Sequence, residues 1–178
     1  SEMCIRDRLW ETLQLISIRI LGSIKNYMDN ELKFDEIKEL IPHREPFIYL
    51  DRLINIEKLK KASGIKRFRK SEEFFKGHFP DKPVVPGVIL IEMMAQTAAA
   101  LIAYSLKSET FDKIVYLMNV ESSKFRLPVL PEMKVRADVE SLRSRGRVWK
   151  FYGKMNDEND NIVCESIWSA MIMDKQDV

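Results

Sequence analysis

The feature that most restricts the fold of this sequence is a long apolar run in the middle of the chain, from Pro86 to Leu106. The run is rich in Ala, Leu, Ile and Met, which favour a helix, and Pro86 suits a first helical position. At ~20 residues it has the length of a membrane span, but Glu92, Gln96 and Thr97 in its first half argue against a lipid environment. A helix that is apolar nearly all round is typical of a buried domain axis. We therefore predict a central helix over residues 86–106 and no membrane.

The residues after this run change to a period of two, which is typical of half-buried antiparallel strands. Strands are predicted over residues 114–125, 133–142, 148–156 and 162–173. Before the run, we predict a short helix that includes Phe34 and stops before Pro42, a strand over 47–57 and a strand over 63–70. In the first of these strands, one face is expected to carry Ile48, Leu50, Arg52, Ile54 and Ile56. The pattern indicates an α+β domain in which a sheet of five or six strands covers the long helix.

The chain of 178 residues has the size of one domain, which we place over residues 29–178. With 46% hydrophobic residues it is not a disordered chain. Residues 1–28 form an N-terminal extension of undetermined role. Leu9, Leu13, Ile16 and Ile20 give it helical spacing, but its charges do not suit a membrane span, and it lacks the cleavage site of a secretory signal. With only two Cys, Cys4 and Cys164, no disulfide framework or Cys-based zinc site is expected.

The net charge of +2 gives no reason to expect a nucleic-acid partner. One segment, residues 58–70, carries seven Lys or Arg and no acidic residue. Two interpretations remain open for it: an edge strand protected by lysines, or a docking patch for an acidic partner.

The chemistry available to the chain is restricted by its two histidines, His43 and His78. His78 precedes a loop with prolines at positions 80, 83 and 86, so it sits on a rigid lead-in to the central helix. Gly87 lies in the first turn of that helix, where its backbone N–H has no intrahelical partner. Without a side chain it allows close approach of a ligand, and the helix dipole favours negative charge there.

Glu92 is the unusual residue of the central helix, because few polar residues accompany it. Gln96 lies four residues on and shares its face, together with Val88, Ala99 and Ala103. A solvated stripe on a partly exposed helix is the plain interpretation. The alternative is a functional carboxyl whose pKa is raised by apolar surroundings, so that it acts as an acid near neutrality.

Three blocks of residues resemble the FabZ-type 3-hydroxyacyl-acyl carrier protein dehydratases of bacterial fatty acid synthesis. The central block runs from Gly77-His78-Phe79-Pro80 through Val84-Val85-Pro86-Gly87 to Glu92-Met93-Met94-Ala95-Gln96. The block Ile41-Pro42-His43-Arg44-Glu45-Pro46-Phe47 and the block Lys124-Phe125-Arg126-Leu127-Pro128 are also similar. After Pro131, where the family usually has Gly-Asp, this chain has Glu132-Met133.

The resemblance implies a hotdog fold, a homodimer that commonly assembles as a trimer of dimers, and a site in which His78 faces Glu92 of the partner subunit. It implies dehydration of a (3R)-3-hydroxyacyl thioester to the trans-2-enoyl thioester in the cytoplasm, without a metal or cofactor. His78 fits the base, Glu92 the acid, and the Gly87 backbone N–H the oxyanion contact, with Gln96 holding Glu92. Glu92 in place of the Asp of the related isomerising FabA-type enzymes favours a dehydratase without isomerase activity.

The implied substrate is carried on the phosphopantetheine arm of an acidic acyl carrier protein. The candidate carrier contacts are basic residues: Lys124, Arg126, Arg143, Arg145 and Arg147. His43 is given a structural role, at the turn between the first helix and strand. Two alternatives remain for the function: a hotdog acyl thioesterase, and a non-catalytic subunit that binds an acyl carrier protein.

Overall fold

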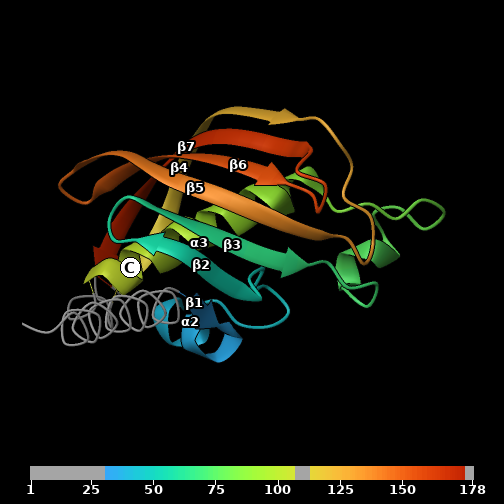
Figure 1. The fold of residues 1–178 in the computed structure, drawn as a ribbon, viewed down its shortest axis with the longest axis horizontal. Helices are drawn as coiled ribbons and strands as arrows, with labels where there is room; N and C mark the ends of the chain where they lie inside the picture. Colours follow the sequence, from blue (N-terminus) through green and yellow to red (C-terminus); the bar gives the residue numbers. More distant parts are fainter. Residues whose placement is uncertain (1–30, 107–112, 175–178) are drawn as a thin grey trace, which may run out of the picture. The chain divides into compact units, whose positions relative to one another are not determined.

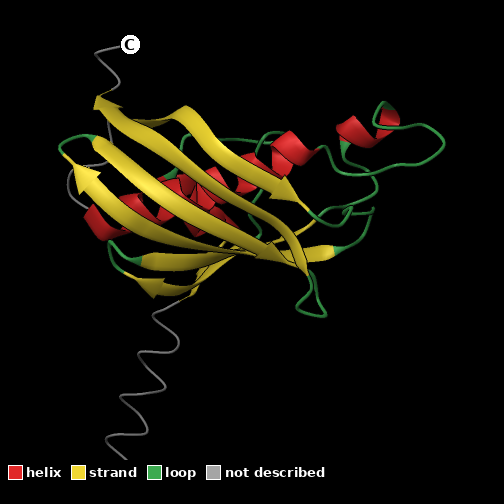
Figure 2. Ribbon diagram, turned by 90° about the horizontal axis from the view of Figure 1, so that it is seen from above, coloured by secondary structure: helices red, strands yellow, loops and turns green. Residues whose placement is uncertain are grey.

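The computed structural model describes residues 31–106 and 113–174. In it, a long helix lies along one face of a seven-stranded sheet with the order β1-β2-β3-β5-β6-β7-β4 (Figures 1 and 2). The elements are β1 (Glu31–Lys33), α2 (Phe34–Leu40), β2 (Arg52–Glu57), β3 (Lys61–Arg67), the 3₁₀ turn η1 (Glu73–Lys76), α3 (Gly87–Leu106), β4 (Lys113–Phe125), β5 (Lys134–Arg145), β6 (Val148–Asn156) and β7 (Ile162–Asp174). The pairs from β2 through to β4 are antiparallel. The predicted α+β class is confirmed, and the sheet is larger than expected.

The predicted central helix is confirmed as α3, with Pro86 directly before its first residue, Gly87. By length and composition alone α3 could cross a membrane, but 61% of its most apolar window is buried inside the protein, as in the core helix of a soluble domain. The four strands predicted after it and the short helix before Pro42 are also confirmed within one to three residues at each end. These elements carry strong local periodicity, which is why the sequence was sufficient to locate them.

The prediction for residues 47–57 is wrong in two respects. The strand β2 begins only at Arg52, and its buried residues are Leu53 and Ile56, whereas Arg52 is exposed and Ile54 is half-buried. The pairing with β3 is irregular between Ile54 and Glu57, and Asn55 lies between them with a φ of +54°. This break changes which side chains face the core, so a simple alternation fails there.

The edge-strand interpretation of residues 58–70 is also wrong. Strand β3 lies inside the sheet, between β2 and β5. Lys66 is buried, and its Nζ lies 3.2 Å from a carboxylate oxygen of Glu72 and 3.5 Å from one of Asp51. Its charge is therefore matched inside the protein rather than offered to a partner.

Glycines in the sheet allow α3 to pack closely against it. A Cβ on Gly64 of β3 would lie 2.2 Å from Oγ1 of Thr97, and one on Gly153 of β6 would lie 2.7 Å from Sδ of Met94. Contacts this short are sterically forbidden, so only glycine fits at these two crossings. The close approach fixes the helix against the sheet and so sets where Glu92 lies.

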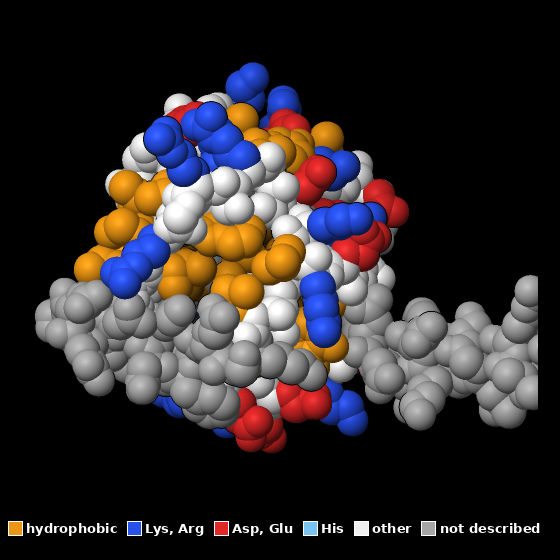
Figure 3. Space-filling view, turned by 90° about the vertical axis from the view of Figure 1, so that its left-hand side faces the viewer, with side chains coloured by type: hydrophobic (Ala, Val, Ile, Leu, Met, Phe, Trp, Pro, Cys, Tyr) orange, Lys and Arg blue, Asp and Glu red, His pale blue; other side chains and the backbone are white. Residues whose placement is uncertain are grey.

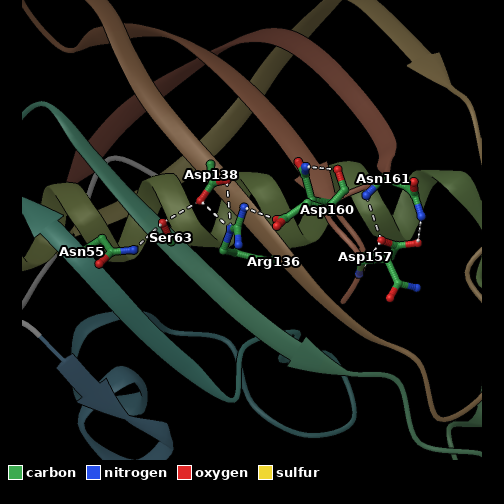
Figure 4. A network of polar contacts seen from close by, with 9 residues as sticks. Asn55, Ser63, Arg136, Asp138, Asp157, Asp160 and Asn161 are labelled. Atoms are coloured by element: carbon green, nitrogen blue, oxygen red, sulfur yellow. Dashed lines mark hydrogen bonds and ion pairs between the residues drawn. The ribbon is translucent and has the colours of Figure 1, made fainter.

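The face of the sheet away from α3 carries a polar network that runs from β3 across β5 to the turn before β7 (Figure 4). Asp138 of β5 accepts hydrogen bonds from Ser63 of β3 and from Arg136, and Arg136 also donates to Asp160 in the turn before β7. In that turn, Asp157 accepts hydrogen bonds from the backbone and side chain of Asn161. These groups are paired with one another, which is typical of a structural network.

The described residues from Leu32 onward form one compact unit. The boundary predicted between residues 28 and 29, and the helical spacing from Leu9 to Ile20, lie outside the described residues. The division into an extension and a domain therefore stays a prediction.

Candidate active site

Glu92 is held by the side chain of Gln96, as their spacing on one helix predicted. Nε2 of Gln96 donates to Oε1 of Glu92 at 2.9 Å and to the carbonyl of Phe47 at 3.0 Å. The backbone N–H of Tyr49 donates to Oε1 of Gln96 at 2.8 Å. Gln96 is buried, so the segment before β2 fixes its amide, and the amide in turn fixes the carboxyl of Glu92.

The structure adds His43, which the sequence had placed at the helix–strand turn. Its Nε2 lies 3.3 Å from Oε1 of Glu92, and the two side chains are 24% and 22% exposed. The ring does not cap α2, whose C-terminal contact is the backbone bond from Ile41 to Ile37. The only available signal was that His43 lies in a block shared with the resembling family, and that signal did not reveal its partner.

The expectation of a raised pKa for Glu92 is wrong for this chain. Burial is the largest single influence and raises the pKa of the carboxyl. The hydrogen bonds from His43 and Gln96, together with the electrostatic attraction of His43, outweigh it and lower the pKa below its ordinary value. The carboxyl is therefore ionised near neutrality in the single chain.

His78 lies in the loop between η1 and α3, and its ring is fixed by that loop. Nδ1 is 2.9 Å from the carbonyl of Val84, and the ring stacks on Phe79 with centroids 4.1 Å apart. The backbone N–H of Val84 donates to the carbonyl of His78, which closes the loop from both sides. Because a carbonyl only accepts, Nδ1 carries a proton, and in the neutral ring Nε2 presents a lone pair. The ring is thus oriented as a base.

Gly87 is the first residue of α3, and no hydrogen-bond acceptor for its backbone N–H is found among the residues that the structure describes. The space where its Cβ would lie is covered by Phe125, the last residue of β4. This close approach was expected for a ligand, whereas in the single chain it is made by an aromatic ring that is 51% exposed. Phe125 was not recognised from the sequence as part of the site.

His78 and Glu92 make no hydrogen bond or ion pair with each other in the described part of the chain. The structure therefore brings together Glu92, Gln96 and His43, and separately orients His78. A cavity of about 760 Å³ lies between residues 45–52 and η1, but neither His78 nor Glu92 lines it.

The five candidate carrier contacts do not form one patch. Lys124 and Arg126 lie at the end of β4 near the start of α3, and Arg126 is paired with Glu165. Three further arginines lie in or beside the β5–β6 hairpin: Arg143, Arg145 and Arg147. The register aligns that hairpin with Tyr116 rather than Lys124, eight residues away along β4, or roughly 26 Å. Figure 3 views the end of the molecule at which the β5–β6 hairpin lies, and there Lys and Arg side chains border hydrophobic ones.

No cluster of three or more His, Cys, Asp or Glu side chains suited to a metal ion is found within residues 31–106 and 113–174. Cys164 is buried in the core, and burial raises the pKa of its thiol to about 11, which keeps it protonated near neutrality. The titratable side chains that the structure places at the site are the carboxyl of Glu92 and the imidazole of His43.

Comparisons with known proteins show which family the chain resembles over most of its length. A family model described as a FabA-like domain matches residues 41–166. The chain is 43% identical over 152 residues to the 3-hydroxyacyl-[acyl-carrier-protein] dehydratase FabZ of Rhodospirillum rubrum, covering 85% of this chain and 94% of the relative. It is 47% identical over 137 residues to that of Gluconacetobacter diazotrophicus, with coverages of 77% and 84%.

Solved structures share the hotdog fold at low sequence identity. The dehydratase heterocomplex ApeI:P from Xenorhabdus doucetiae matches with a TM-score of 0.65 at 14% identity, covering 79% of this chain and 92% of that one. A thioesterase superfamily member from Thermus thermophilus matches with a TM-score of 0.53 at 16% identity, covering 68% and 87%. At these identities the likeness concerns the fold alone.

Proposed function

The chain belongs to the FabZ-type 3-hydroxyacyl-[acyl-carrier-protein] dehydratases, and from this premise we propose how its residues carry out the reaction. The enzyme is a hydro-lyase of fatty acid biosynthesis that converts a 3-hydroxyacyl thioester into the 2-enoyl thioester. One C–H bond and one C–O bond break, a C=C bond forms, and the proton and hydroxyl leave as water. The chemistry requires a base at the α-carbon, an acid at the hydroxyl, and a donor for the enolate-like oxygen.

The observation that carries the mechanism is the orientation of His78. Its Nδ1–H is bound to the carbonyl of Val84, so Nε2 is the nitrogen that takes the α-proton. The free backbone N–H of Gly87, at the positive end of α3, receives the developing charge on the thioester oxygen. Each proton-transfer group contributes on the order of 10²–10⁴ in rate.

Glu92 protonates the departing hydroxyl. In the single chain its pKa is lowered, but burial is the largest influence and acts in the opposite direction. A bound acyl chain would remove more water from the carboxyl, and this raises its pKa toward the range in which it donates a proton. Acid function is thus expected of the site when the substrate occupies it.

A homodimer would bring His78 of one subunit to Glu92 of the other. Two features support this part of the proposal: His78 and Glu92 do not contact each other within the described chain, and β4 ends the sheet as a long strand. Four of its hydrophobic residues before Phe125 are 38–51% exposed: Tyr116, Leu117, Met118 and Val120. An unpaired apolar edge of this kind favours pairing with a second copy. Dimers would assemble further as a trimer of dimers.

The substrate arrives on the phosphopantetheine arm of an acyl carrier protein, in the cytoplasm and without a metal or other cofactor. Lys124 suits the carrier contact because it is exposed beside the start of α3, where the oxyanion donor lies. Arg126 suits the carrier contact less well because it is paired with Glu165, and the hairpin arginines lie at the other end of the sheet.

The experiment follows the enoyl thioester absorbance with a 3-hydroxyacyl thioester, and assays free thiol in parallel. Dehydration without thiol release is expected. Thiol release without dehydration would identify a thioesterase instead. If the chain binds an acyl carrier protein and catalyses neither reaction, it is a non-catalytic subunit.

His78→Ala and Glu92→Gln should each abolish dehydration in a folded protein. Mixed dimers of the two variants should regain part of the activity, and verified mixed dimers that stay inactive would exclude a shared site.

A further inference from the structure

His43 is the one histidine that the mechanism above does not use. Its Nε2 and the Nε2 of Gln96 both approach the same oxygen of Glu92, Oε1, at 3.3 Å and 2.9 Å. None of the described residues donates a hydrogen bond to the other oxygen, Oε2. The carboxyl is thus anchored through one oxygen and open through the other.

Within the described residues, the imidazole of His43 makes no polar contact other than the one with Glu92. Its Nδ1 is buried and has no hydrogen-bond partner among the described residues, so the Glu92 contact is the ring's polar interaction. The rest of the ring lines a small cavity of about 20 Å³ with apolar side chains that include Pro42, Ala99 and Ala103. Alanine at both helix positions leaves room for the ring beside α3, and the packing fixes its direction.

We propose that His43 is a positioning residue for Glu92: with Gln96 it holds Oε1, so that Oε2 is the oxygen presented to the substrate hydroxyl. The inference rests on the proposed function, since it assigns a support to the proposed acid. A carboxyl with a single donor keeps rotational freedom, whereas two converging donors select one orientation. Small displacements of a reacting group cost large factors in rate, so this support is expected to appear in kcat.

The groups that surround Glu92 are consistent with this role. From the segment before β2, the imidazole of His43 and the phenol of Tyr49 interact electrostatically with it, and Glu92 contributes to a raised pKa of Tyr49. From its own helix, Gln96 faces it as a neutral amide. The guanidinium of Arg44 is directed instead to the carbonyls of Ile41 and His43. His43 is thus the charged or ionisable group that directly supports the carboxyl within the described residues.

Three substitutions separate the donor from the packing. His43→Gln places an amide N–H near the position of Nε2, His43→Asn places one near the position of Nδ1, and His43→Leu has none. We expect His43→Leu and His43→Asn to lower kcat about 10–100-fold with KM nearly unchanged, as for other supporting residues. His43→Gln should recover most of the loss. Because Asn is polar and small, it keeps the test valid if the Leu variant does not fold.

A second readout does not depend on activity. Protein made with ¹³C-carboxyl glutamate is titrated by NMR, and the Glu92 resonance is assigned by its loss in Glu92→Gln. Removal of the His43 donor should move the Glu92 midpoint to higher pH in His43→Leu and His43→Asn, whereas His43→Gln should stay closer to the parent. A residue that only fills space would not produce this pattern.

The outcomes distinguish the proposed dehydratase function from the positioning role of His43. If the parent enzyme does not dehydrate its substrate, the proposed function fails, and the titration still reports whether His43 supports Glu92. If the parent is active but His43→Leu and His43→Asn keep its kcat and its Glu92 midpoint, the positioning role is wrong. A His43→Gln variant that is as impaired as His43→Asn in both readouts would also overturn it.

Discussion

The ring of Phe125 covers Gly87, so the last residue of β4 lies against the first residue of α3. A Cβ on Gly87 would lie 2.8 Å from Cε1 of Phe125 and 3.0 Å from Cζ. The oxyanion donor and the aromatic ring are therefore sterically coupled. Because the ring is half-exposed, it can move aside at little cost to the fold.

Gly87→Ala tests this coupling. We expect the variant to keep its stability within about 1 kcal/mol, because the added methyl group displaces a half-exposed ring and alanine favours the helix. We expect kcat/KM to fall by roughly tenfold or more, because the ring moves and the backbone donor is obstructed. The control is Gly77→Ala, whose Cβ would meet nothing within 4 Å. Equal activity of the two variants would exclude the coupling.

The lowered pKa of Glu92 predicts a specific pH dependence of stability. A carboxyl whose folded pKa lies below its ordinary value of 4.5 stabilises the fold above that pH, and the contribution is lost as pH falls through the folded pKa. Glu92→Gln should therefore lose less stability than the parent between pH 5 and pH 3. Urea unfolding of both proteins across this range measures the difference. Parallel curves would contradict the prediction.

The exposed edge of β4 predicts that a charge there weakens the dimer. Met118→Lys places an ammonium group on a side chain that is 51% exposed in the single chain and would be desolvated by a second copy. We expect sedimentation to show a shift toward monomer and a loss of activity. Leu142→Lys is the matched control, since Leu142 is 48% exposed on β5 inside the sheet and should leave the assembly unchanged.

Because Lys124 lies far from Arg145 of the β5–β6 hairpin, substitutions of the two residues should affect binding of the acyl carrier protein unequally. Lys124→Glu should raise KM for an acyl carrier protein substrate about tenfold, while KM for a free pantetheine thioester changes little. Arg145→Glu, at the far end of the sheet, should leave both values within about twofold. At high salt, the effect of Lys124→Glu on KM for the carrier substrate should be smaller. An equal effect of both substitutions would place the carrier elsewhere.

Glu132 adopts a φ of +67° at the position where the family usually has glycine. Two hydrogen bonds stabilise this turn: the backbone N–H of Glu132 donates to the carbonyl of Phe68, and its side chain accepts from the N–H of Lys70. Glu132→Ala keeps the strained backbone and loses the side-chain bond, so it should be less stable than Glu132→Gly by about 1 kcal/mol. Thermal unfolding of the two variants measures this; a more stable alanine variant would contradict it.

The local sequence pattern was sufficient to predict the helix α3, the strands β4 to β7 and the pairing of Glu92 with Gln96. These depend on periodicity and on spacing within one helix, which the sequence carries directly. The irregular β2 strand was not predictable in this way, because a single residue at positive φ changes which side chains face the core. The burial of Lys66 also depends on Asp51 and Glu72, which reach it from other segments.

The sequence by itself determined that His78, Gly87 and Glu92 lie around the start of one buried helix, since they are close along the chain. Only the tertiary structure decided that His43 contacts Glu92, because 49 residues separate the two and no local rule connects them. It also decided the direction of the Glu92 pKa. Burial alone raises that pKa, and the folded chain lowers it by bringing two donors to one carboxyl oxygen.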